Sequence, residues 1–116
     1  MAEREIDPAG ISALLNIDPI VHAPARLSVL TYLYVVERSD FTFLKNMTGL
    51  TWGNLSTHLS KLEGAGYVTI EKQFKGKKPH TMIRLTDRGR AAFRAYKENL
   101  QRVLDDLPEE ATSAGP

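Results

Sequence analysis

The stretch that decides the fold is TWGNLSTHLSKLEGAG, residues 51–66. Thr51 is a good N-cap for a helix that starts here, and the glycines at the end of the stretch are typical helix stops. The large apolar residues recur at spacings of four and three: Leu55, Leu59 and Leu62. At about 100° per residue they lie within about 60° of one another. The stretch therefore predicts a helix with one buried side and a slim, polar outer side.

A β-hairpin is predicted immediately after this helix. Residues 67–74 are rich in β-branched and aromatic side chains, which favour a strand, and residues 80–85 alternate as a second strand would. Residues 75–79, with the sequence KGKKP, form the predicted tip between the two strands. The hairpin thus carries three lysines at its end: Lys75, Lys77 and Lys78.

Two helices are predicted between residues 24 and 47. Pro24 is a helix-start signal, and apolar residues at helical spacing predict a helix to about Glu37. Ser39 and Asp40 are expected to interrupt the helical pattern after this helix, and Thr42 is expected to cap a shorter helix through Met47. Its apolar residues are expected in the core: Phe43, Leu44 and Met47.

The two ends of the chain also carry helix signals. Asp7 and Pro8 resemble an N-cap and first helical position, with an apolar stripe of Ile11, Leu14 and Leu15. Thr86 is expected to cap a long final helix, which Pro108 ends. Its apolar residues form a seam at spacings of three and four: Phe93, Tyr96, Leu100, Val103 and Leu107. Such a seam predicts a helical partner.

The order of elements predicts a mostly helical α+β fold, a winged helix-turn-helix with a two-stranded β-hairpin wing and a C-terminal dimerisation helix. We expect an N-terminal helical extension at residues 1–17 and the winged helix-turn-helix at residues 18–86. The dimerisation helix follows at residues 87–107, and residues 108–116 have the composition of a disordered tail.

Charge is segregated along the chain although the formal net charge is only +1. Residues 61–102 carry eleven basic and four acidic side chains, whereas the last 14 residues carry four acidic and no basic ones. Such a basic segment is typical of a phosphate-binding surface, and charge alone leaves an ordinary solvated face equally open. The lysine-tipped hairpin beside a polar helix favours DNA.

The outer side of the helix at residues 51–66 suits base readout. Its small or polar residues are Gly53, Asn54, Thr57, Ser60 and Lys61. Asn can pair with adenine, Ser and Thr can reach a base or a phosphate, and Lys can reach guanine or a phosphate. Gly53 is costly in an ordinary helix, so its position suits close approach to another surface. His58 flanks the leucine stripe, where it is expected to position the helix or contact a phosphate.

The chain resembles small winged-helix transcriptional regulators related to the MarR and ArsR groups. The resemblance spans residues 18–104 and includes GNLSTHLSKLE in the recognition helix and LTDRGR after the wing. It implies a homodimer built from the first and last helices. Together with the residue pattern it gives these DNA-binding candidates: Thr51, Gly53, Asn54, Ser56, Thr57, His58, Ser60, Lys61, Lys75, Lys77, Lys78 and Arg84. The dimer candidates are Ile11, Leu14, Leu15, Phe93, Tyr96, Leu100, Val103, Leu104 and Leu107.

Metal and cofactor chemistry is not expected. The chain has no cysteine, so the metal box of ArsR sensors is missing, and His22, His58 and His80 are far apart in sequence. No nucleophile, base and orienting group form a catalytic set, so we expect no enzyme. Trp52 is expected to be partly buried rather than to stack on a base. Aromatic residues that could line an effector pocket are more often core: Tyr32, Tyr34 and Tyr96.

We therefore expect a transcriptional regulator that binds a double-stranded DNA operator as a homodimer. The alternative is a winged-helix interaction module whose basic hairpin binds an acidic partner protein, and single-stranded nucleic acid ranks third because exposed aromatics are few. The acidic N-terminus is unlike a signal peptide, and the apolar stretch 27–36 is too short to span a bilayer. These features predict a cytoplasmic protein.

Overall fold

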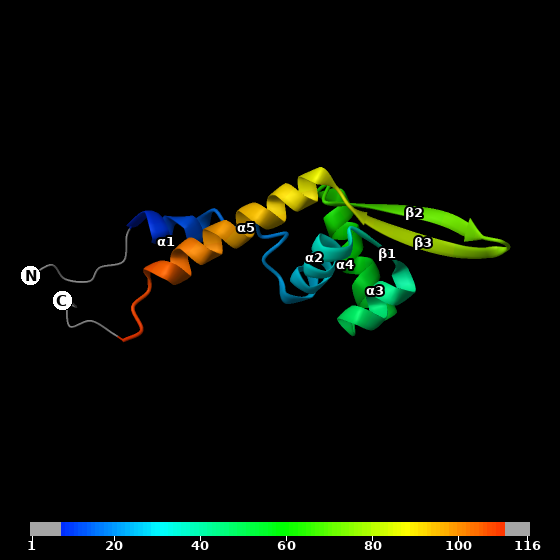
Figure 1. The fold of residues 1–116 in the computed structure, drawn as a ribbon, viewed down its shortest axis with the longest axis horizontal. Coiled ribbons are helices and arrows are strands. Elements are labelled where there is room, and N and C mark those ends of the chain that lie inside the picture. Colours follow the sequence, from blue (N-terminus) through cyan, green and yellow to red (C-terminus); the bar gives the residue numbers. More distant parts are fainter. Residues whose placement is uncertain (1–7, 111–116) are drawn as a thin grey trace, which may run out of the picture.

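The computed structural model describes residues 8–110 and contains five helices and three strands in that range. The helices are α1 (Pro8–Leu15), α2 (Pro24–Val36), α3 (Phe41–Thr48), α4 (Trp52–Gly64) and α5 (Asp87–Asp106). The strands are β1 (Arg38–Asp40), β2 (Val68–Lys75) and β3 (Lys78–Leu85). Helices α2, α3 and α4 form a central body, from which α5 and the β2–β3 hairpin extend in opposite directions (Figure 1). This arrangement confirms the winged helix-turn-helix prediction.

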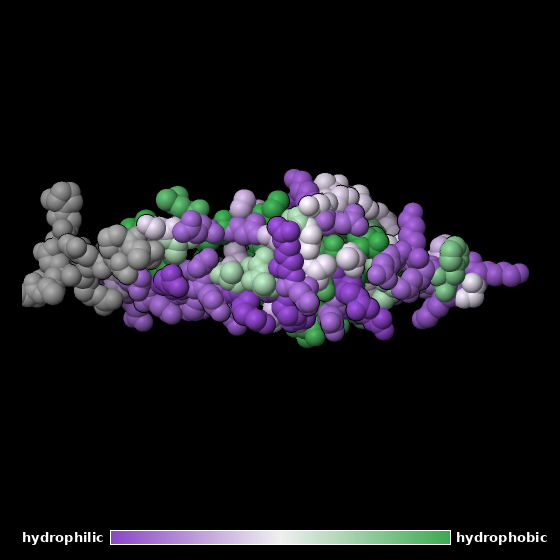
Figure 2. Space-filling model, turned by 90° about the horizontal axis from the view of Figure 1, so that it is seen from above, coloured by the Kyte–Doolittle hydropathy of each residue, from purple (hydrophilic) through white to green (hydrophobic). Residues whose placement is uncertain are grey.

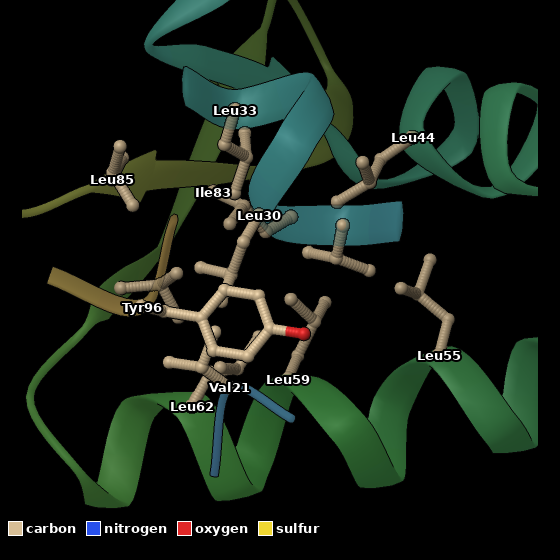
Figure 3. Close-up of a cluster of buried hydrophobic side chains, with 12 residues drawn as sticks. Val21, Leu30, Leu33, Leu44, Leu55, Leu59, Leu62, Ile83, Leu85 and Tyr96 are labelled. Carbon is tan, nitrogen blue, oxygen red and sulfur yellow. The ribbon is translucent and has the colours of Figure 1, made fainter. Parts of the chain in front are cut away.

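The core forms where α4 meets α2, α3 and the sheet. The α4 leucines point from the helix toward Leu30, Leu44 and Ile83, as Figure 3 shows. Leu55, Leu59 and Leu62 are at most 1% exposed, which confirms that their side of α4 faces inward. Burying a leucine side chain contributes about 2 kcal/mol, so these residues fix which side of α4 is left for solvent.

Side-chain caps explain where three of the helices begin. The Thr51 hydroxyl accepts a hydrogen bond from the Asn54 amide at 3.1 Å, and the Thr86 hydroxyl accepts one from the Gly89 amide at 2.9 Å. Both caps were predicted. Helix α3, in contrast, is capped by Asp40, whose carboxylate accepts from the Phe43 amide at 2.7 Å. The assignment of this cap to Thr42 was wrong because Thr42 already lies inside α3, whereas Asp40 immediately precedes the helix and reaches the free amide of Phe43.

The sheet has a third strand that the sequence did not predict. Residues 38–40 were expected only as a break, but β1 pairs antiparallel with β3, with Ser39 opposite Ile83. The sheet order is therefore β1-β3-β2. A strand of three residues is too short to show alternation, and its partner lies more than forty residues away in the sequence.

Two apolar residues of α3 are not in the core. Phe43 and Met47 are 52% and 56% exposed, so their predicted burial was wrong, whereas Leu44 is fully buried as predicted. Leu44 is the one fully buried residue of α3 and Phe41 packs partly against the core, because a helix of eight residues offers the core only one narrow side.

The ends of the described range agree in part with the sequence reading. Helix α1 ends at Leu15 and α5 ends at Asp106, before Pro108. Asp7 and residues 111–116 lie outside the described range, so its predicted cap and most of the predicted tail are not covered. In the loop that leads to α2, the Asp18 carboxylate accepts a hydrogen bond from the Ile20 amide.

Candidate nucleic-acid interface

The outward side of α4 carries small and polar side chains. Exposed residues on α4 and its cap include seven of the predicted DNA-binding candidates: Thr51, Gly53, Asn54, Ser56, Thr57, Ser60 and Lys61. We call this surface the polar face of α4. No atom from another element lies within 4 Å of the position that a Gly53 Cβ would take, so the backbone is open there. The face can therefore approach another surface closely.

The basic hairpin tip consists of Lys75, Lys77 and Lys78, all exposed. Lys75 and Lys78 are paired across the last rung of the hairpin, and Gly76 turns the chain with φ of +65°. Hydrophilic side chains cover most of the far end of this hairpin in the space-filling view (Figure 2). Arg84 is exposed but lies at the other end of β3, opposite Thr69. Arg84 thus belongs to the base of the wing and not to the tip.

A groove of about 500 Å³ separates one flank of α4 from the hairpin. Ser56 and Ser60 line it from α4, and Lys78 and His80 line it from β3. Trp52 also faces the groove; its ring stacks on Phe41 with centroids 4.7 Å apart and an angle of 10° between the rings. Trp52 is 58% exposed, so its predicted partial burial was wrong, although Phe41 covers one face of the ring.

The opposite flank of α4 contacts α2. The Arg26 guanidinium lies 3.2 Å from Nδ1 of His58, and the same guanidinium donates to the backbone oxygens of Pro19 and Ile20. Burial lowers the pKa of His58, and the positive charges of Arg26 and Lys61 lower it further. His58 is half-buried and therefore differs from the exposed residues of the polar face. The sequence analysis missed Arg26, because a residue 32 positions from His58 gives no local signal.

The predicted dimer residues fall into two groups. Those with substantial exposure are Ile11, Leu14, Leu15, Leu104 and Leu107. In contrast, Tyr96 is 7% exposed and Val103 is 5% exposed, and Phe93 and Leu100 pack against the core. Part of the predicted seam therefore packs within one protomer and is not free for a dimer contact. Helix α1 lies along α5 in the same protomer (Figure 1).

The other side-chain groups weighed in the sequence lie in separate environments. Tyr32 contacts Phe43, Tyr34 contacts Phe93, and the Tyr96 hydroxyl is 2.9 Å from Nδ1 of His22. Within residues 8–110 no three His, Cys, Asp or Glu side chains gather as metal ligands would. In the same range no helix combines the length and apolarity that crossing a membrane requires.

Comparison with known proteins agrees with this geometry. A family model of the winged helix DNA-binding domain matches residues 25–104. The chain belongs to this winged-helix family. The match covers most of residues 18–104, over which the sequence resembles winged-helix transcriptional regulators, and it confirms that resemblance.

Relatives of this winged-helix protein include both archaeal and bacterial proteins. It is 39% identical over 77 residues to the uncharacterized protein MJ0432 of Methanocaldococcus jannaschii, covering 66% of this chain and 84% of the relative. It is 26% identical over 83 residues to the uncharacterized HTH-type transcriptional regulator YdgJ of Bacillus subtilis, covering 72% of this chain and 50% of YdgJ. Of these two relatives YdgJ is named as a transcriptional regulator, and this chain spans half of its length.

Solved structures show the same fold. A transcriptional regulator homologue from Pyrococcus horikoshii superimposes with a TM-score of 0.77 at 28% identity, covering 81% of this chain and 95% of that one. The transcriptional repressor CouR, bound to a 23-mer DNA duplex, gives a TM-score of 0.67 at 26% identity, with coverage of 86% and 68%. CouR is a MarR-family regulator, so the MarR-like character of this winged-helix protein is confirmed.

Proposed function

We propose that this protein regulates transcription by binding double-stranded DNA as a homodimer, with α4 in the major groove and the basic hairpin tip on the backbone. The observation that carries the proposal is the polar face of α4, left outward by three buried leucines and placed beside a lysine-tipped hairpin. An α-helix fits the major groove, and exposed lysines neutralise phosphates. The DNA-bound CouR structure supports the same use of this fold.

The α1 and α5 helices support the dimer. They lie alongside each other as an arm that projects away from the central body (Figure 1), and their leucines are exposed on it. Leu15 is 86% exposed, and Leu104 and Leu107 are about half exposed. A second copy would cover these side chains and place two α4 helices about one DNA turn, roughly 34 Å, apart. The operator would then be close to a palindrome.

The dimer has a direct test. The double variant Leu104→Glu and Leu107→Glu should run as a monomer in analytical ultracentrifugation, because charges would enter the apolar contact. Val35→Glu is the matched control, since Val35 is an exposed apolar residue of α2 that lies outside the arm. A wild-type monomer at micromolar concentration, or loss of the dimer in both variants, would contradict this arrangement.

DNA binding is tested by mobility shift with fragments of the source genome and by a salt titration. Each phosphate contact contributes about 0.9 to the slope of log affinity against log salt. Lys77→Ala with Lys78→Ala removes two lysines from each protomer, so the slope should fall by about 3.6 in the dimer, equally for all sequences. Asn54→Ala should instead change base preference. If the purified protein, freed of nucleic acid, binds no DNA duplex but captures an acidic protein, the alternative of an interaction module would be favoured.

A further inference from the structure

The two flanks of α4 have different neighbours. At about 100° per residue, Ser56 and His58 lie on opposite sides of the leucine stripe. Ser56 faces the groove that ends at the hairpin, whereas His58 faces α2. A helix of about 10 Å diameter nearly fills a major groove about 12 Å wide, so each flank faces one of the two DNA strands. The hairpin lies beside the Ser56 flank only, so its lysines can contact the DNA strand on that side and not the strand on the His58 side.

The bonds of Arg26 fix the protonation of His58. The Nε of Arg26 donates to the Ile20 oxygen at 2.6 Å, and its Nη2 donates to the Pro19 oxygen at 3.3 Å. Its Nη1 lies 3.2 Å from Nδ1 of His58. A guanidinium has donors only, so Nδ1 must be the acceptor. His58 is therefore a neutral imidazole whose proton is on Nε2.

The surroundings of His58 keep it in this state. Burial and the positive charges of Arg26 and Lys61 lower the pKa of His58, which favours the neutral ring at pH 7. Lys61 follows His58 by three positions and therefore lies on the same flank, nearly one turn along the helix. This flank thus combines one N–H donor with two positive charges, which is the chemistry that binds a phosphate group.

We propose that Arg26, His58 and Lys61 form a second phosphate-binding edge, on the DNA strand opposite the one that the hairpin tip contacts. His58 donates from Nε2 to a phosphate oxygen, and Lys61 contributes its charge. Arg26 is a positioning residue that holds the ring and adds positive charge behind it. The proposal rests on the proposed function, and it divides the backbone contacts of one protomer between two strands.

Phosphate ethylation interference on a bound operator fragment tests this division. In the wild-type protein, ethylation should block binding at positions on both strands beside each half-site. Within each half-site, His58→Ala should weaken the interference on one strand only, and the Lys77→Ala, Lys78→Ala variant should weaken it on the other. Because the proposed dimer is two-fold symmetric, the affected strand alternates between the two half-sites. Because His58 is neutral, His58→Ala should leave the salt slope nearly unchanged, whereas Lys61→Ala should lower it by about 1.8 for the dimer. Lys97→Gln, which removes an exposed charge from α5, is the control and should change neither pattern.

The outcomes separate this inference from the proposed function. If the wild-type protein binds DNA and His58→Ala keeps the wild-type interference on both strands, the second edge is wrong and the function stands. If no fragment binds at any salt concentration, the function itself is wrong, and this edge with it.

Nitrogen NMR of His58 in the wild-type protein tests the tautomer without any substitution, and Arg26→Met then tests the role of Arg26. The wild-type ring should show a protonated Nε2 and a bare Nδ1, and a ring protonated mainly on Nδ1 would overturn the assignment. In Arg26→Met the pKa of His58 should rise, because a positive neighbour and a donor to Nδ1 are lost. An unchanged pKa in that variant would show that Arg26 does not hold the ring.

Discussion

Gly89→Ala is expected to destabilise this protein strongly, although Gly89 lies in a helix where alanine is normally favoured. A Cβ on Gly89 would lie 2.1 Å from the Tyr67 carbonyl oxygen and 2.9 Å from Cδ1 of Leu85. Ordinary contact begins at 3.4 Å, so the start of α5 and the Tyr67 backbone would have to separate by about 1.3 Å. The close approach thus depends on the absence of a side chain.

The cost follows from what holds these segments together. The Thr86 amide donates to the Tyr67 oxygen at 3.0 Å, and the Thr86 hydroxyl donates to the Gly66 oxygen at 2.6 Å. Overpacking costs about 1 to 3 kcal/mol, and each weakened hydrogen bond about 1 kcal/mol more. We therefore expect a loss of about 3 kcal/mol in the free energy of unfolding, or about 12 °C in Tm for a domain of this size.

Urea unfolding followed by circular dichroism measures this loss. Gly64→Ala is the matched control, because no atom lies within 4 Å of the position of its Cβ; its stability should stay within about 0.5 kcal/mol of wild type. A Gly89→Ala protein that unfolds within about 3 °C of wild type would refute the reasoning, since the contact at Tyr67 would then relax at little cost.

Three further predictions concern α4, the Tyr67 hydroxyl and the start of α3. Gly53→Ala should leave stability unchanged or raise it by up to about 1 kcal/mol, because the site is open, yet weaken DNA binding in a mobility shift; unchanged affinity would argue against close approach. Burial and the carboxylate of Asp18 raise the pKa of Tyr67 to about 12 from an ordinary value near 10, so the folded state holds this proton more tightly. The resulting stability is present below pH 10 and is lost as the pH rises toward 12; Tyr67→Phe should lack this loss in urea titrations, and parallel curves would disprove it. Asp40→Ala should cost about 1 kcal/mol through the lost cap to Phe43, measured by thermal unfolding, and an equal cost for Thr42→Ala would show that the cap is not specific.

The candidate site was predictable where its signal is local. The polar face of α4 follows from three leucines within one helix, and the lysine-rich tip follows from five consecutive residues. The caps at Thr51 and Thr86 are likewise fixed by their bonds to amides three positions later. Such patterns are complete within one element, so no knowledge of neighbouring elements is required.

The dimer residues show where that reasoning fails. Tyr96 and Val103 share a helical seam with Leu107 in sequence, but the structure buries the first two inside the protomer. Periodicity tells which side of a helix is apolar and does not tell which element covers it. Which seam residues stay exposed depends on how α1 and the core pack against α5, and the sequence of α5 does not contain that information.

The sequence by itself determined the order of the helices and of the β2–β3 hairpin, the inward side of α4 and the charge at the end of the hairpin. Only the tertiary structure decided that residues 38–40 pair with β3, that Phe43 and Met47 stay exposed, and that Arg26 holds His58. The physical reason is the distance along the chain. Helix caps and amphipathic sides arise from interactions within a few residues, whereas strand pairing and the Arg26–His58 contact join segments that only the folded core brings together.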